Sequence, residues 1–262
     1  MTLSLGDLQK RFRSAQSQAA LTELQELLAS DTRTGAVALV GRCAKRLQKL
    51  EAETRRMHKI FSLRADLVLK GAQWVAGVDE VGVGPLVGSV VAAAVILPDK
   101  PDLPGLNDSK KLTAAVRERL DQSIREQAIA FCIAEVDPPT IDRLNIYHAA
   151  LEAMRRAVVG LSQSPDHVLV DARTIPGIEI PQTPIVHGDA EDGSIAAASV
   201  LAKVYRDEQM QQLHARYPEY GFDHNMGYPT QEHRDALERL GALPEHRRSF
   251  GPVAVARPRE LS

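Results

Sequence analysis

The segment Trp74–Leu97, WVAGVDEVGVGPLVGSVVAAAVIL, is the most apolar stretch of the chain, yet it carries two adjacent carboxylates, Asp79 and Glu80. Burying an unpaired carboxylate is costly, so such a pair needs a compensating partner. Glycines occupy three of the next eight positions, and they allow a tight turn and a close approach to the backbone. A buried Asp that caps a turn or pairs with an arginine would leave Glu80 and the glycines unexplained. We interpret the segment as a strand whose end binds a metal ion.

The composition is typical of one large globular domain, or of one domain with an extension. The chain has 262 residues, of which 44% are hydrophobic and 25% charged. Its two cysteines, Cys43 and Cys132, lack metal-ligand spacing, which favours reduced residues in a cytoplasmic protein. Charged residues are spread through residues 1–31, so we expect no signal peptide. Asp79 and Glu80 interrupt the long apolar run, so we do not expect it to span a membrane. No heptad repeat is present, and a monomer is expected.

Charge is distributed unevenly along the sequence. Residues 1–73 hold thirteen Lys and Arg against seven Asp and Glu, whereas the remainder holds nineteen against twenty-seven. A basic arm suits a polyanionic partner, and an acidic body suits cations. A solvated helix face would produce the same asymmetry.

Residues 1–70 are predicted to form an all-helical N-terminal extension that ends at Gly71. Apolar residues recur at helical spacing over 5–28, and a second helical pattern runs over 34–69. Basic residues lie along the second pattern from Arg42 to Lys59. This face would suit a nucleic-acid backbone, and a solubilising outer face is an equally good interpretation.

From Gln73 onward, short β-branched runs alternate with helical patterns, which predicts an α/β fold with helices packed on a mixed sheet. The first two strands are expected to be antiparallel and the later ones parallel. We expect an α/β core over 71–216 and a helical C-terminal segment over 217–262, with a loose tail from Gly251. The predicted strands are 74–79, 90–97, 129–136, 167–170 and 184–186, and the predicted helices are 113–127, 139–160 and 194–216.

Two further acids follow predicted strands at the places where they could meet the first pair. Asp171 ends HVLVD and Asp189 ends IVHGD. Ligand sites of open α/β sheets gather at strand ends, so residues far apart in sequence converge there. Four clustered carboxylates would repel unless a cation neutralises them, and their oxygens suit Mg²⁺ or Mn²⁺. Two such ions, as in many nucleases, would support hydrolysis of a phosphodiester.

Seven motifs, in order and spacing, resemble the bacterial ribonuclease HII family over residues 75–253, and the helical extension is similar to that of some Gram-positive members. The resemblance implies a ribonuclease H-like catalytic core over 71–216, a substrate-binding segment over 217–262, and a quartet of metal-binding catalytic residues at Asp79, Glu80, Asp171 and Asp189. It implies cleavage of the RNA strand of RNA/DNA hybrids and nicking 5′ of ribonucleotides embedded in duplex DNA, by two ions that Asp79 bridges. The motifs are GVDEVGVGPLVG, LNDSKKL, LNIYHA, VLVDA, HGDAEDGSIAAASVLAKVYRD, YPEYGFDHNMGYPT and HRRSFGPV.

The same resemblance implies a set of substrate contacts. The Asp108–Lys111 loop offers hydroxyl and ammonium donors that would hold phosphates without reading bases, although it also has the pattern of a helix N-cap with two solvated lysines. Tyr228 would stack on the sugar next to the ribonucleotide, and Arg247 and Arg248 would clamp the duplex backbone. The implied contacts are Gly82, Val83, Gly84, Asp108, Ser109, Lys110, Lys111, Asn145, His187, Ser194, Lys203, Tyr228, Arg247 and Arg248.

Three positions depart from the family pattern by losing positive charge. Val83 stands where the family has Arg or Lys between two glycines, and His187 and Met226 each stand where it has lysine. We therefore expect retained metal chemistry, weaker substrate binding and stronger salt sensitivity. Two alternatives remain open: a hybrid-binding family member with impaired catalysis, and a ribonuclease HIII-like nuclease that cuts only continuous hybrids.

Overall fold

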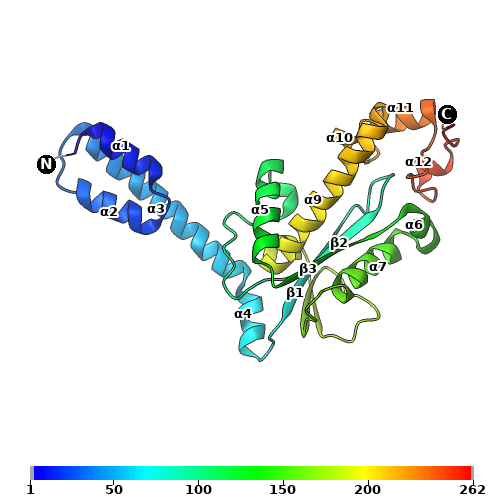
Figure 1. The fold of residues 1–262 in the computed structure, drawn as a ribbon, viewed down its shortest axis with the longest axis horizontal. Coiled ribbons are helices and arrows are strands. Elements are labelled where there is room, and N and C mark those ends of the chain that lie inside the picture. The colour runs from blue at the N-terminus through cyan, green and yellow to red at the C-terminus, as the bar shows by residue number, and fades with distance from the viewer. Residues whose placement is uncertain (1–2, 261–262) are drawn as a thin grey trace. The chain divides into compact units, whose positions relative to one another are not determined.

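The N-terminal unit extends to Lys59 and consists of helices packed around leucines. The structure is a computed structural model that describes residues 3–260. The predicted helix over 5–28 is in fact two helices, α1 (Leu5–Ser14) and α2 (Gln18–Leu28) (Figure 1). The chain breaks between them because the Ser17 side chain accepts a hydrogen bond from the Ala20 amide and caps α2.

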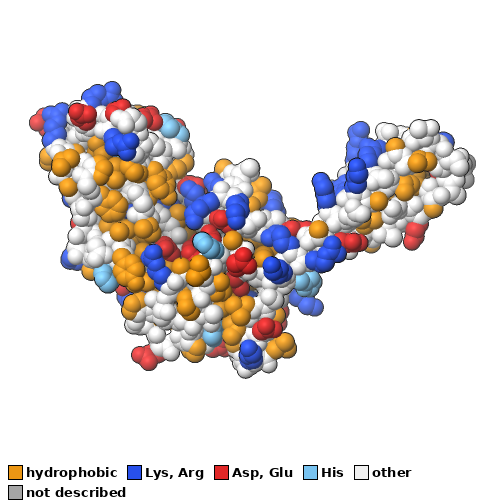
Figure 2. Space-filling model, turned by 180° about the vertical axis from the view of Figure 1, so that it is seen from behind, with side chains coloured by type: hydrophobic (Ala, Val, Ile, Leu, Met, Phe, Trp, Pro, Cys, Tyr) orange, Lys and Arg blue, Asp and Glu red, His pale blue; other side chains and the backbone are white. Residues whose placement is uncertain are grey.

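The second predicted helix of the extension is also divided. α3 (Thr34–Ile60) is followed by α4 (Ser62–Leu69), and the second unit begins at Ile60 rather than at Gly71. α4 belongs to this second unit because Arg64, which is 4% exposed, donates a hydrogen bond of 2.7 Å to the carbonyl oxygen of Leu97. The basic side chains of the N-terminal unit gather along one of its sides (Figure 2).

A five-stranded mixed sheet forms the centre of the second unit, as predicted, with the strand order β3-β2-β1-β4-β5. β1 pairs with β2 in antiparallel fashion and with β4 in parallel fashion, and β4 pairs in parallel with β5. β3 pairs with β2 in antiparallel fashion, so the expectation that the later strands are parallel is wrong for β3. β1 therefore lies in the middle, which explains its apolar sequence. The strands are β1 (Val75–Val81), β2 (Val90–Ile96), β3 (Ala130–Val136), β4 (His167–Asp171) and β5 (Gln182–Ile185).

Helices cover both faces of this sheet (Figure 1). α7 (Ile146–Val159) buries its alanines and Met154 against one face, and α9 (Gly193–Arg216) packs on β1 and β2 from the other. α5 (Ala114–Gln127) packs on α9. β1 and α9 approach at Gly77, where a Cβ atom would lie 2.1 Å from the backbone carbon of Ser194. No side chain fits at this crossing.

The predicted helix over 139–160 is divided into α6 (Pro138–Leu144) and α7. The break is at Asn145, whose φ of 64° is left-handed and whose side chain accepts a hydrogen bond from the His148 amide. Asparagine tolerates this backbone conformation better than most residues, and it caps the new helix.

The C-terminal segment packs on the glycine-containing loop that follows β1. Its core includes Tyr220, Phe222 and Leu237, and it also contains Leu86 and Val87 of that loop. The expectation of a loose tail from Gly251 is wrong, because Val253 is fully buried and the 257–259 backbone bonds to Ala242. The helical elements here are η2 (Pro218–Tyr220), α10 (Phe222–Asn225), α11 (Gln231–Leu240) and α12 (Gly251–Ala254).

None of the helices within residues 3–260 has the length and apolar character needed to span a membrane.

Candidate metal centre

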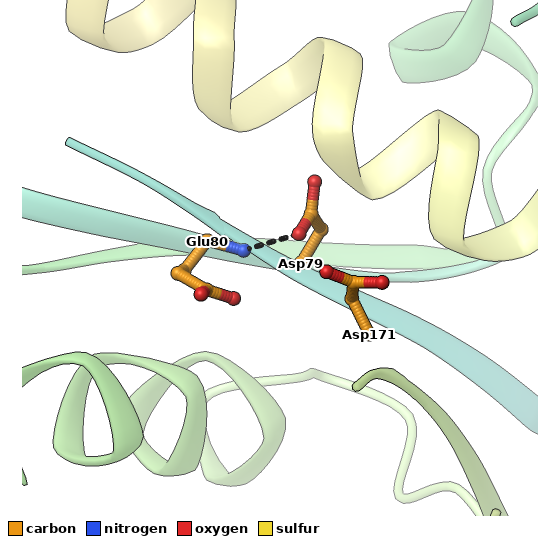
Figure 3. Close-up of side chains that lie close together, drawn as sticks. All are labelled: Asp79, Glu80 and Asp171. Carbon is orange, nitrogen blue, oxygen red and sulfur yellow. Dashed lines mark hydrogen bonds between the residues drawn. The ribbon is translucent and has the colours of Figure 1, made fainter. Parts of the chain in front are cut away.

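Three carboxylates meet at the ends of the two central parallel strands. Asp79 and Glu80 stand near the end of β1, and Asp171 is the last residue of β4. One carboxylate oxygen from each lies within 4.8 Å of the others. Figure 3 shows Asp79 and Glu80 extending to opposite sides of their strand, with Asp171 beside them. The Glu80 amide donates a 2.8 Å hydrogen bond to Asp79, which fixes the orientation of that carboxylate.

The carboxylates are held in surroundings that disfavour their charge. Burial raises the pKa of Asp79 well above its ordinary value, and repulsion from Glu80 adds to this rise. Burial also raises the pKa of Glu80, although Arg173, whose Nη1 is 4.0 Å from Oε1, opposes the rise. Glu80 Oε2 is buried and has no hydrogen-bond partner among residues 3–260. An orphaned buried oxygen beside two other carboxylates fits a hard divalent cation such as Mg²⁺ or Mn²⁺.

Asp189 is next to these three carboxylates without joining them. It lies in the short helix α8 (Gly188–Glu191) rather than at a strand end, since β5 stops at Ile185. The amide of its neighbour Gly188 donates to Asp171 Oδ1 at 2.7 Å. Burial raises the pKa of Asp189, and repulsion from Asp108 adds to this rise. The Lys110 Nζ atom, 3.6 Å from Asp189 Oδ2, partly offsets it.

Ser199 of α9 was missed by the sequence interpretation. A hydrogen bond between Ser199 and Asp79 partly lowers the pKa of that aspartate, and Ser199 Oγ is 2.9 Å from Ser109 Oγ. The expected phosphate contact at Ser109 is wrong, because its side chain is buried and ties the 3-10 helix η1 (Ser109–Lys111) to α9. The small residues of SIAAAS indicated close packing, but not which serine would reach β1.

Arg247 is not a clamp on the duplex, because it is fully buried. Its guanidinium donates hydrogen bonds to four carbonyl oxygens of the loop after β1, over distances of 2.6–3.2 Å. Burial lowers its pKa to about 9, and repulsion from Arg206 contributes. Arg248 is exposed and donates to the Ala242 carbonyl at 3.2 Å. The four bonded carbonyls belong to Gly82, Val83, Pro85 and Gly88.

Two further predicted contacts are also occupied elsewhere. Ser194 is completely buried at the crossing of α9 and β1, so it cannot reach a substrate. Lys203 forms an ion pair with Asp207 at 2.5 Å, and Asp207 also lies 3.3 Å from Arg117. The contact predicted for Ser194 is therefore wrong, whereas the contact predicted for Lys203 stays a prediction.

Three of the remaining predicted contacts, Asp108, Lys110 and Lys111, lie in or directly before the 3-10 helix η1. Lys110 and Lys111 are exposed, and Lys111 Nζ lies 3.5 Å from Asp108, whose carboxylate caps η1. This capping is the helix N-cap alternative, and it leaves both ammonium groups accessible. Left-handed φ values of 50–64° occur at the turn residues Asn145, His187 and Met226.

Tyr228 lies against the glycine-containing loop, with its side chain 45% exposed. A Cβ atom at Gly84 would be 3.3 Å from its ring. The Tyr228 carbonyl accepts from His233 Nδ1 at 3.0 Å, and His233 Nε2 accepts from His246 Nε2 at 3.0 Å. The Leu243 amide donates to His246 Nδ1, which fixes this sequence of neutral tautomers. Both histidines are buried and position the backbone beneath the tyrosine.

The histidine pair predicts a loss of stability in acid. Burial lowers the pKa of His246 from 6.5 to about 3 and also lowers that of His233. Below pH 6.5 the unfolded chain takes up protons that the folded chain excludes, so this contribution to stability falls as pH decreases toward 3. The loss of unfolding free energy between pH 7 and pH 5, measured in urea, is expected to be smaller in His246→Asn than in the parent chain. The exposed His58→Gln serves as the control, and equal losses in all three proteins would contradict the assignment.

The sheet order, the helices on both faces and the acidic strand ends define a protein of the ribonuclease H-like class. A structure of ribonuclease H2 from Pyrococcus horikoshii shares this fold with a TM-score of 0.61 and 27% identity, over 70% of this chain and 96% of that one. The family model described as Ribonuclease HII matches residues 76–253, and the Ribonuclease HII N-terminal domain matches residues 4–63. The chain therefore belongs to the ribonuclease HII family.

Curated relatives extend over almost the whole chain. Ribonuclease HII of Myxococcus xanthus is 49% identical over 97% of this chain and 86% of its own length. Ribonuclease HII of Geobacillus thermodenitrificans is 46% identical over 94% of this chain and 98% of its own length. By family, the protein is a metal-dependent endonuclease of the ribonuclease H type that acts on RNA/DNA substrates.

Proposed function

We propose that this protein hydrolyses the RNA strand of RNA/DNA hybrids and nicks duplex DNA 5′ of single embedded ribonucleotides, leaving 5′-phosphate ends. The observation that carries the proposal is the approach of three carboxylate oxygens to within 4.8 Å at the ends of β1 and β4. Asp79, Glu80 and Asp171 would hold the catalytic cations, with Asp189 completing the set. Two bound Mg²⁺ or Mn²⁺ ions would activate water and stabilise the leaving 3′-oxygen.

The chain's own residues would hold the substrate beside this centre. The exposed ammonium groups of Lys110 and Lys111 would contact phosphates, because long-range attraction and charge-assisted hydrogen bonds favour a polyanion there. The ring of Tyr228, half exposed over Gly84, would stack on a sugar next to the ribonucleotide. These contacts would recognise the sugar-phosphate backbone rather than base identity.

The deciding experiment compares two labelled duplexes, one with a single ribonucleotide and one a continuous RNA/DNA hybrid. With Mg²⁺ or Mn²⁺ we expect cleavage of both, with the nick in the first duplex on the 5′ side of the ribonucleotide, and no cleavage in EDTA. Failure to cut either duplex would overturn the proposal.

A hybrid-only nuclease is the second candidate, and Val83 is the observation that favours it. Its apolar side chain offers no donor to the 2′-hydroxyl and packs partly against the core. Cleavage of the continuous hybrid alone, in the same experiment, would favour this candidate.

A further inference from the structure

Two arginines are buried together beneath the loop Gly82–Gly88. Arg206 of α9 is 2% exposed, and Arg247 is fully buried. Within residues 3–260, neither guanidinium lies within 4.0 Å of a carboxylate oxygen. Among the carboxylates, Asp207 attracts Arg206 and Asp142 attracts Arg247. Both of these acids already have other partners.

Asp207 pairs with Lys203 and Arg117, and Asp142 accepts hydrogen bonds from the amides of Arg248 and Ser249. The two buried guanidinium charges therefore stay largely uncompensated. Carbonyl oxygens accept hydrogen bonds from both groups, but a buried charge without an opposite charge still costs folding free energy.

The arginines contact the loop through its carbonyl oxygens, and Arg206 also donates to the carbonyl of Met226 at 3.4 Å. Arg247 donates to the carbonyls of Gly82 and Val83, and Arg206 donates to the carbonyl of Val87 at 3.2 Å. In a trans peptide the N–H group points opposite to the C=O group of the same unit. The amides of Val83 and Gly84 therefore point away from the arginines, and across the described chain neither has an acceptor.

The loop itself is shaped by this contact. Gly82 has a φ of +87°, and a Cβ atom there would lie 2.2 Å from Arg206 Nε. Glycine lets the backbone close onto the guanidinium. The result is a short run of aligned peptide dipoles with their positive ends outward, above two positive charges, and such arrangements bind anions.

The family resemblance already implies that the backbone of Gly82, Val83 and Gly84 contacts substrate; we propose that Arg206 and Arg247 are the positioning residues that orient this backbone and supply the positive charge beneath it. They supply from beneath the loop the positive charge that Val83 does not supply from above. The inference rests on the proposed function, because the contact is with the ribonucleotide-containing substrate. Tyr228, whose ring lies over Gly84, borders the same backbone.

The test removes one buried charge while keeping the shape of its side chain. Arg206→Met preserves the aliphatic stem, and Arg206→Gln is a second neutral variant that keeps an N–H donor for the Val87 carbonyl. Arg206→Lys restores the charge. Arg64→Met is the matched control, since Arg64 is also a buried arginine bonded to a backbone carbonyl, but it lies on α4.

The dissociation constant of a duplex with one ribonucleotide is measured in EDTA by fluorescence anisotropy at several salt concentrations, and the unfolding free energy in urea. We expect Arg206→Met and Arg206→Gln to weaken binding about tenfold, as for loss of a charge-assisted contact, with a shallower salt dependence. Their unfolding free energy should be unchanged or higher, and Arg206→Lys should bind nearly as the parent does. KM should rise while kcat stays within about twofold.

Unchanged affinity in both neutral variants would overturn the proposal. Equal weakening in Arg64→Met or in Arg206→Lys would also overturn it, because a merely structural role predicts those results. The binding measurement needs no catalysis. A parent chain that binds the duplex but does not cut it would therefore contradict the proposed function, while the affinities of the variants would still decide the role of the arginines.

Discussion

Asp79→Asn is expected to lower the cleavage rate by about a thousandfold or more, and to make the metal-free protein more stable. The loss of rate follows because a bound metal ion contributes several kcal/mol of charge stabilisation in the transition state, and each 1.36 kcal/mol corresponds to about tenfold. The gain in stability follows from the raised pKa of Asp79. As pH rises above the ordinary range of an aspartate, the unfolded chain loses its proton before the folded chain does, so stability falls. Asparagine removes this contribution.

The two effects are measured separately. Single-turnover cleavage with Mg²⁺ gives the rate, and urea unfolding in EDTA at pH 5 and pH 8 gives the stability difference between variant and parent, which should grow toward pH 8. Asp102→Asn, at an exposed position, is the control and should change neither quantity. Retention of most of the activity in Asp79→Asn, or a variant less stable than the parent at pH 8, would contradict the metal-centre assignment.

Gly77→Ala is expected to cause the largest loss of stability of any conservative change in the sheet. The added Cβ atom would lie 2.1 Å from the backbone carbon and 2.2 Å from the carbonyl oxygen of Ser194. Because both neighbours are backbone, β1 and α9 must separate, at a cost of about 3 kcal/mol or more. The cleavage rate should fall as well, since Ser199 would move relative to Asp79.

Thermal unfolding provides the measurement, and a decrease in Tm of roughly 6–12 °C is expected for a unit of this size. Gly41→Ala is the matched control, because no atom lies within 4 Å of a Cβ at that helical position. Alanine there should be neutral or slightly stabilising. Equal Tm values for Gly77→Ala and the parent would show that the crossing can adapt.

The meeting of Asp79, Glu80 and Asp171 could be predicted from the sequence because each acid lies at or near the end of a predicted strand. Asp79 and Asp171 each follow an apolar run, and parallel neighbours bring such ends together. Asp189 does not lie at a strand end, because β5 stops at Ile185 and the acid belongs to the short helix α8. The hydrophobic pattern of the sequence does not indicate this early end of the strand.

The arginines show where sequence interpretation fails. Arg247 and Arg248 are adjacent and chemically identical, yet one is fully buried and the other exposed. The difference arises from a loop more than 150 residues earlier, whose carbonyls accept from Arg247. Ser199 and Arg206 were missed for the same reason, since each depends on a long-range contact of α9. Helix breaks such as that at Asn145 depend on a single left-handed residue inside a continuous apolar pattern.

α9 holds two parts of the proposed site at a fixed distance from each other. Ser199 of this helix hydrogen-bonds to Asp79 of the proposed metal centre, and Arg206 lies beneath the Gly82–Gly88 loop. Seven residues of α-helix separate them, a rise of about 10 Å. A helix neither stretches nor compresses appreciably. One rigid helix, rather than two loops that move independently, would therefore set the distance between the ribonucleotide and the cleaved phosphate. Errors in the position of the nick would then require α9 itself to shift.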